Sequence, residues 1–175
     1  MTHTQIVLIA NVISILGAIL MVAIGLIKSK KGVLLAQCGQ FTLLGLSNLL
    51  LGGLTGVIVD IVSIIRNVYC SKRNMTWPIK IAFIVIQLII AVPMNKIGWL
   101  GWLPIISTSI FTLFIDVKKD EHLKILIIFT TMFWVVYDFG LMNYTASLFD
   151  ALSIVSNVVG LIMILKGGSK KVAEG

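Results

Sequence analysis

Charged residues are scarce in this 175-residue chain, at 12% of the total, which is about half their share in soluble domains. Prolines number only three, so helices can run with little interruption, and two cysteines are too few for a disulfide framework. Hydrophobic residues instead make up 58% of the sequence. No polar stretch is long enough for a soluble nucleotide-binding or catalytic module. The composition predicts an all-α membrane protein, with residues 1–175 as a single transmembrane domain.

Seven apolar stretches are each long enough for about one membrane-spanning helix and a short loop. Barrel strands are excluded because runs such as ILGAILMVAIGLI are apolar on nearly every side, without the alternation of a barrel strand. The predicted spans are residues 5–27, 32–52, 54–71, 78–94, 98–116, 122–142 and 145–166.

The basic residues indicate the orientation of these spans. All of the fourteen lysines and arginines except Lys96 fall on one side of the predicted membrane, in the odd-numbered loops, the adjacent helix ends and the tail. The positive-inside rule makes that side cytoplasmic. We therefore expect a multi-pass inner (plasma) membrane protein with its amino terminus outside and a short basic cytoplasmic tail at 167–175. The net charge of +7 does not indicate a nucleic-acid partner, because the basic residues are dispersed over short loops rather than gathered in one patch.

An internal repeat emerges when the sequence is shifted by 90 positions. LTGVIVDIVSIIRNV (54–68) then aligns with YTASLFDALSIVSNV (144–158) without a gap, and Asn48 aligns with Asp138. The coinciding polar pairs are Thr55 with Thr145, Asp60 with Asp150, Ser63 with Ser153, and Asn67 with Asn157. This alignment predicts a first repeat at about 5–71, a linker helix at about 78–94 and a second repeat at about 98–166.

Three spans, one linker span and three spans form a 3+1+3 arrangement. The linker span gives both repeats the same direction, so they are parallel and related by a pseudo-twofold axis along the membrane normal. We expect a substrate path at the interface between them.

Polar residues at helical spacing mark the candidate path. An aspartate inside a membrane helix costs about 2.5 to 3.5 kcal/mol on insertion scales, so Asp60 and Asp150 are expected to line a cavity or to be paired. In each repeat the aspartate, a serine and an asparagine occupy positions i, i+3 and i+7, which lie on one helix face. The candidate cavity residues are Asp60, Ser63, Asn67, Asp150, Ser153 and Asn157.

Four further residues have open roles. Asn48 and Asp138 either extend the cavity or cap helix ends, and Trp134 either stacks on a planar solute or packs against its neighbours. Arg66 corresponds to the uncharged Ser156 in the other repeat. Its side chain either snorkels to the cytoplasmic surface or pairs with an acidic group or phosphate.

No enzyme signature is convincing. The Tyr137-Asp138 pair and Asp150 suggest an intramembrane aspartyl protease, but Ser147-Leu148-Phe149 replaces the Gly-x-Gly pattern before the second aspartate. Nucleophilic triads, phosphate loops and metal-ligand spacings are also missing from the sequence. We expect no catalytic residue, cofactor or metal.

The sequence resembles bacterial inner-membrane proteins of the YgjV type, small chains whose third span ends in an element like Ser63-Ile64-Ile65-Arg66-Asn67. This resemblance covers nearly the whole chain. The 3+1+3 plan more broadly resembles the superfamily of SWEET sugar facilitators and PnuC vitamin transporters, which implies movement of small polar metabolites by alternating access. Pro78, Pro93 and Pro104 form no Pro-Gln dipeptide, which departs from SWEET repeats.

Two functions remain at this stage. The first is a transporter or facilitator of a small polar metabolite, nucleoside-, vitamin- or sugar-like, whose hydroxyls or amines the aspartates would accept. The alternative is a non-transporting membrane protein that binds a protein or lipid partner, with the polar residues holding its helices together. In both cases the lipid bilayer is a partner, and a homo-oligomer is compatible with the sequence but not required by it.

Overall fold

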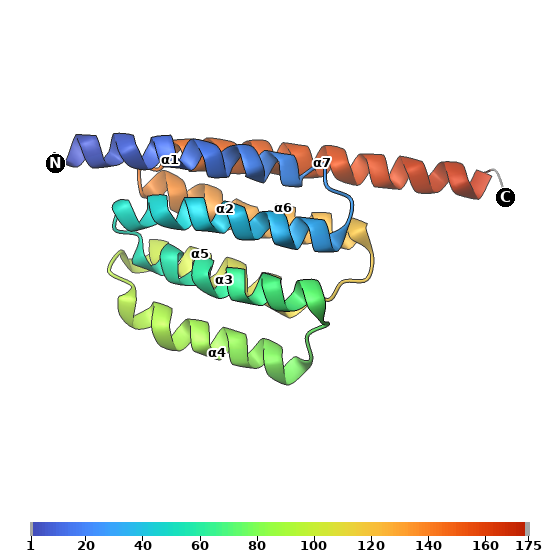
Figure 1. Cartoon of the computed structure of the whole chain (residues 1–175), viewed down its shortest axis with the longest axis horizontal. Helices are drawn as coiled ribbons and strands as arrows, with labels where there is room; N and C mark the ends of the chain where they lie inside the picture. The colour runs from blue at the N-terminus through green and yellow to red at the C-terminus, as the bar shows by residue number, and fades with distance from the viewer. Residues whose placement is uncertain (1, 174–175) are drawn as a thin grey trace.

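The computed structural model describes residues 2–173, and the side chains of residues 2–166. Helices make up all the regular structure of this part of the chain, and the α-helices alternate in direction from one to the next along the sequence (Figure 1). In chain order they are α1 His3–Ile24, α2 Lys30–Leu50, α3 Leu54–Lys72, α4 Trp77–Met94, the 3-10 helix η1 Gly98–Gly101, α5 Trp102–Phe114, α6 Asp120–Gly140 and α7 Tyr144–Ala173.

Six of these helices are long and apolar enough to cross a membrane: α1, α2, α3, α4, α6 and α7. The predicted fifth span, 98–116, differs, because it is divided into η1 and the 13-residue α5. Gly98 has a φ of 62° that favours glycine, and Pro104 lies in the first turn of α5, where proline is tolerated. At about 1.5 Å per residue, α5 measures about 20 Å and is shorter than a membrane core.

The last helix extends beyond the predicted span. The part of α7 that could cross a membrane is Tyr144–Lys166, close to the expected 145–166, and its helical backbone continues to Ala173. The side chains of 167–173 lie outside the described part of the chain.

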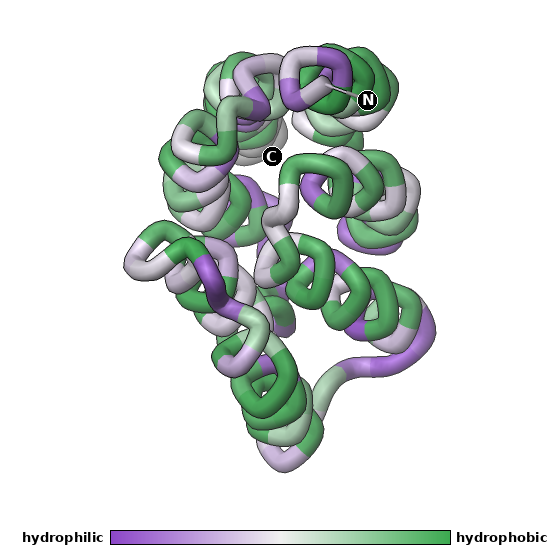
Figure 2. The backbone as a smooth tube through the Cα atoms, turned by 90° about the vertical axis from the view of Figure 1, so that its left-hand side faces the viewer, coloured by the Kyte–Doolittle hydropathy of each residue, from purple (hydrophilic) through white to green (hydrophobic). Residues whose placement is uncertain are grey.

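The helices form two rows of three. Along one row α1 packs on α2 and α2 on α3, and along the other α5 packs on α6 and α6 on α7. The rows meet where α1 contacts α7 and where α3 contacts α5, while α4 packs on α3 and α5 (Figures 1 and 2). This places α4 at one edge of the bundle, at the bottom of both views.

Corresponding elements of the two rows lie 90 positions apart. The bounds of α2 and α6 differ by 90 at both ends, as do the last residues of α1 and α5 and the first residues of α3 and α7. The turn after α2 also has the same construction as the turn after α6. Gly53 N donates to Asn48 O at 2.8 Å and Asn143 N donates to Asp138 O at 2.9 Å. A positive φ recurs at Gly52 (77°) and Met142 (61°), so the same turn is built once with glycine and once without it.

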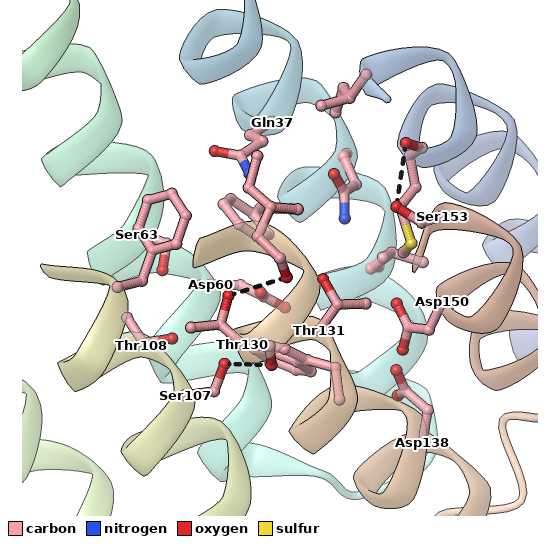
Figure 3. Close-up of a pocket in the computed structure, with 18 of the residues that line it drawn as sticks. Gln37, Asp60, Ser63, Ser107, Thr108, Thr130, Thr131, Asp138, Asp150 and Ser153 are labelled. Carbon is pink, nitrogen blue, oxygen red and sulfur yellow. Dashed lines mark hydrogen bonds between the residues drawn. The ribbon is translucent and has the colours of Figure 1, made fainter. Parts of the chain in front are cut away.

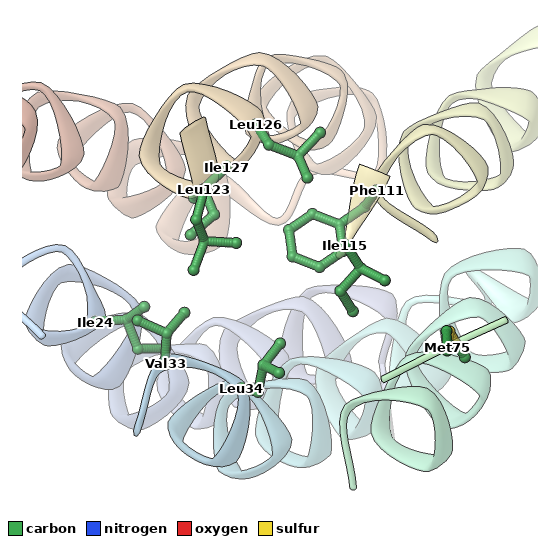
Figure 4. Packing of buried hydrophobic residues seen from close by; sticks show 9 residues of the cluster. All are labelled: Ile24, Val33, Leu34, Met75, Phe111, Ile115, Leu123, Leu126 and Ile127. Carbon is green, nitrogen blue, oxygen red and sulfur yellow. The ribbon is translucent and has the colours of Figure 1, made fainter. Parts of the chain in front are cut away.

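The two ends of the bundle differ in charge. We call the end with the 25–29, 73–76 and 115–119 loops the basic end, because it carries most of the loop lysines. An apolar cluster from both rows fills the interior there (Figure 4). Its members are Ile24, Val33, Leu34, Met75, Phe111, Ile115, Leu123, Leu126 and Ile127.

Two buried lysines hold helix ends together near the basic end. Lys124 Nζ donates to Ile24 O at 3.1 Å and to Gly25 O at 2.7 Å, so its charge lies at the carboxyl end of α1, the favourable end of a helix dipole. Lys80 Nζ lies 2.8 Å from Asp116 Oδ2 and joins α4 to the end of α5. Both lysines thus have partners within the fold.

Candidate functional site

A cavity of about 50 Å³ lies between the two rows. Its described lining residues come from α1, α2, α3, α5, α6 and α7, and α4 contributes none of them. A space of this size holds a few water molecules or a very small solute. The six helices of the two rows, which lie on either side of α4 in the sequence, therefore build one shared site.

Three aspartates line this cavity, one from each of α3, α6 and α7. Asp60, Asp138 and Asp150 are each 2% exposed. Figure 3 shows the side chains of Asp138 and Asp150 pointing toward one another. Asp60 Oδ2, Asp138 Oδ1 and Asp150 Oδ2 are buried and have no hydrogen-bond partner among the described residues. Buried polar atoms are normally paired, so these oxygens are unlike those of a structural network.

Hydroxyl groups line the middle of the cavity. Ser107 Oγ donates to Thr130 O at 2.9 Å (Figure 3), and Thr130 Oγ1 donates to Leu126 O at 2.8 Å. Ser153 Oγ donates to Met21 O at 3.5 Å. Because these hydroxyl protons are directed to backbone carbonyls, the hydroxyl oxygens remain available mainly as acceptors.

Arg66 lies at the other end of the cavity and is 1% exposed, so it does not snorkel to the surface. Its Nε and Nη2 donate to Asn67 Oδ1 at 3.1 and 2.9 Å, and its Nη1 donates to Thr112 Oγ1 at 3.0 Å. The guanidinium also stacks on Phe111, with 4.6 Å to the ring centroid. No ion pair joins Arg66 to a carboxylate among the described residues. Amide, hydroxyl and aromatic groups therefore replace the acidic partner that we considered from the sequence.

Most of the residues singled out in the sequence line the cavity. These are Asn48, Asp60, Ser63, Arg66, Trp134, Asp138, Asp150 and Ser153. The Trp134 ring also packs edge-on against Tyr137, with 5.5 Å between centroids.

Asn67 and Asn157 are buried but are not among the lining residues. Asn67 Nδ2 donates to Gln37 Oε1 at 3.0 Å, and Asn157 Nδ2 donates to Ser153 O at 2.9 Å. Conversely, Ser107, Thr108, Thr130 and Thr131 line the cavity without having been singled out. Hydroxyls are inexpensive in membrane helices, so they gave little signal in an apolar sequence.

Opposite the basic end, polar contacts join the rows, and we call this the latch end. The Tyr137 hydroxyl donates to Gly53 O and accepts from Gly56 N, both at 3.1 Å. Asn143 Nδ2 donates to Ser47 Oγ at 3.1 Å. Tyr137 corresponds to Ser47 and Asn143 to Gly53 under the shift of 90 positions, so the Tyr137–Gly53 contact and the Asn143–Ser47 contact are counterparts of one another. A Cβ on Gly53 or Gly56 would lie 2.6 Å from the Tyr137 hydroxyl oxygen, so glycine makes this approach feasible.

Replacing Tyr137 with phenylalanine is expected to destabilise the fold by about 1–3 kcal/mol, because Gly56 N and Gly53 O would lose their shared partner in a buried site. Thermal denaturation in detergent, followed by circular dichroism, measures the loss. Tyr144→Phe is the control, since the Tyr144 side chain is exposed. An unchanged midpoint for Tyr137→Phe would contradict the assigned role of the hydroxyl.

Comparison with known proteins gives a family. Searches of curated proteins and of solved structures found no match. The family profile Imp-YgjV, described as a bacterial inner membrane protein, matches residues 8–166, which include most of α1 and the described side chains of α7. The helices of suitable length and composition agree with a multi-pass protein of that membrane. The chain therefore belongs to the Imp-YgjV family of bacterial inner membrane proteins.

Proposed function

We propose that this protein is a transporter or facilitator of a small polar solute, which passes between two parallel three-helix repeats. The observation that carries the proposal is the cavity between the two rows, whose wall contains buried carboxyl oxygens without a hydrogen-bond partner among the described residues. The offset of 90 between corresponding helix bounds supports the repeats, and α4 would be the linker helix of the 3+1+3 arrangement. The loop lysines support a cytoplasmic basic end and an amino terminus outside.

The cavity size bears on the solute and on the mechanism. Pockets for drug-sized ligands measure about 300 Å³ or more, well above the roughly 50 Å³ here. A nucleoside- or sugar-like solute would thus enter only if the rows moved apart. Alternating access requires each end of the cavity to open in turn. The contacts of Tyr137 and Asn143 would close it at the latch end, and the apolar cluster would close it at the basic end.

The alternative, a non-transporting protein with polar residues as structural links, accounts for part of the interior. Asn67, Gln37 and Asn143 have hydrogen-bond partners and fit a structural role. The three aspartates fit it less well, because each has a buried oxygen without a hydrogen-bond partner in the described part of the chain. Transport therefore accounts better for the aspartates.

Uptake into proteoliposomes tests the proposal. Wild-type protein is assayed with pooled labelled nucleosides, vitamins, sugars and small amines, and is compared with Asp60→Asn and Asp150→Asn. We expect uptake of one pool, reduced about tenfold or more by either substitution. Because each change replaces a buried carboxyl group by a neutral amide of similar shape, folding should be retained.

Asp120→Asn is the matched control, since it makes the same chemical change on an exposed side chain at the start of α6. Its uptake should equal that of the wild type. If folded, inserted protein transports no pool, or if Asp60→Asn and Asp150→Asn both transport normally, the proposal is wrong.

A further inference from the structure

The aspartate end of the cavity holds acidic groups without a cationic partner. Each carboxylate is 2% exposed, and neither ion pair among the described residues includes Asp60, Asp138 or Asp150. Arg66, the arginine of the cavity wall, lies six residues along α3 from Asp60, which is about 9 Å of helix. Its donors are also engaged by Asn67 and Thr112. A buried carboxylate is costly unless it is protonated or paired with a cation, so the site favours a bound proton or cation.

Asn48 is an independent indication of a ligand. It lines the same cavity, is 1% exposed, and its Oδ1 has no donor among the described residues. An amide oxygen is neutral, so its lack of a partner does not arise from repulsion between acidic groups. Together with the hydroxyl oxygens of Ser107 and Thr130, it makes the wall rich in acceptors. The missing ligand is thus expected to be a hydrogen-bond donor.

The helices around the aspartates supply no competing charge. The lining residues of α1 are Met21 and Ile24, α2 contributes amides and apolar side chains, and α5 contributes hydroxyls and Phe111. From α6 and α7 the ionisable lining residues are Asp138 and Asp150 themselves. The neighbouring Tyr137 hydroxyl is engaged by Gly53 and Gly56.

The arrangement distinguishes between classes of cation. Among the described residues, no three aspartate, glutamate, histidine or cysteine side chains converge as metal ligands. An ammonium group needs only acceptors placed around its N–H bonds, and such acceptors are present. The small cavity restricts the ligand to a few non-hydrogen atoms in this conformation.

We propose that the facing carboxyl groups of Asp138 and Asp150 bind one small cation of the ammonium class, either ammonium itself or the protonated amino group of a small primary amine, in the cavity that Asp60 and Asn48 also line. The inference rests on the proposed transport function in one respect: if the protein is a transporter, the bound amine names the class of its substrate. Binding itself requires no transport and can be measured separately.

Thermal stability of purified protein at neutral pH tests the binding. Methylammonium chloride is compared with sodium chloride, which matches its charge, and with tetramethylammonium chloride, which has no N–H donor, at equal ionic strength. At about 100 times the dissociation constant, methylammonium should raise the Tm by about 5 °C or more, and the two other salts should not. The rise should disappear in Asp150→Asn and persist in Asp120→Asn.

Asp138→Asn provides a second test if Asp150→Asn does not fold. The inference is overturned by an equal rise with sodium or tetramethylammonium, by no rise with methylammonium, or by a rise that persists in both folded variants. Selective methylammonium binding without uptake of any pool would uphold the amine site and refute transport. Uptake of a non-amine solute by protein that does not bind methylammonium would uphold transport and refute the amine site.

Discussion

Replacing Gly160 with alanine is expected to destabilise the protein by about 2–3 kcal/mol, because the added methyl group has no space. Gly160 is buried in α7, and its Cβ would lie 2.5 Å from the backbone carbonyl oxygen of Gly25. A backbone oxygen cannot rotate away as a side chain can, so α1 and α7 would have to separate. The thermal midpoint in detergent should fall, and it should fall further for larger residues such as Gly160→Leu.

Gly39→Ala is the matched control for this prediction. Gly39 lies within α2, and a Cβ there would meet Leu20 Cδ1 at 3.5 Å, an ordinary contact. Since alanine is favoured over glycine in a helix by about 0.5–1 kcal/mol, Gly39→Ala should preserve or raise the midpoint. Equal midpoints for the two variants would refute the close approach of α1 and α7.

Replacing Arg66 with alanine is expected to cost about 3 kcal/mol or more, because it removes a large buried side chain and leaves its partners unpaired. Asn67 Oδ1 would lose two donors and Thr112 Oγ1 would lose one. Arg66→Met should be considerably less destabilising, since it retains most of the volume and removes a buried charge that has no acidic partner among the described residues.

Unfolding of the two Arg66 variants in detergent provides the comparison, with Arg73→Ala as a control at the end of α3. Equal losses for Arg66→Ala and Arg66→Met would show that the guanidinium contacts, rather than the packed volume, stabilise the fold. No loss in either variant would refute the packing described for Arg66.

Hydropathy predicted the helical class and most of the helix positions, because lipid demands long apolar segments whose backbone bonds are satisfied internally. It overestimated the fifth span, where residues 98–101 carry no charge and precede an apolar stretch but form a 3-10 turn. Apolar content alone cannot distinguish such a turn from a helix. The glycines at 98 and 101 were the available signal.

The candidate site was predictable where charge was involved and less so elsewhere. Asp60 and Asp150 stood out because carboxylates are rare in membrane helices, and both line the cavity. Asn67 and Asn157 share their helix faces, but helical periodicity carries no information on how far along the helix a cavity extends. That extent depends on side chains of other helices, such as Phe111 and Ile127, which belong to both the cavity wall and the apolar cluster.

The pairing of positions 90 apart has a consequence for how such a chain could have evolved. Two copies of one identical three-helix polypeptide would carry the same residue at both positions of every pair. Here Asn48 corresponds to Asp138, and Arg66 to Ser156. Joining the halves in one gene releases them from that identity, so one wall can acquire a carboxylate while the other acquires a guanidinium. The uneven charge of the cavity is thus a property that a dimer of identical halves could not possess.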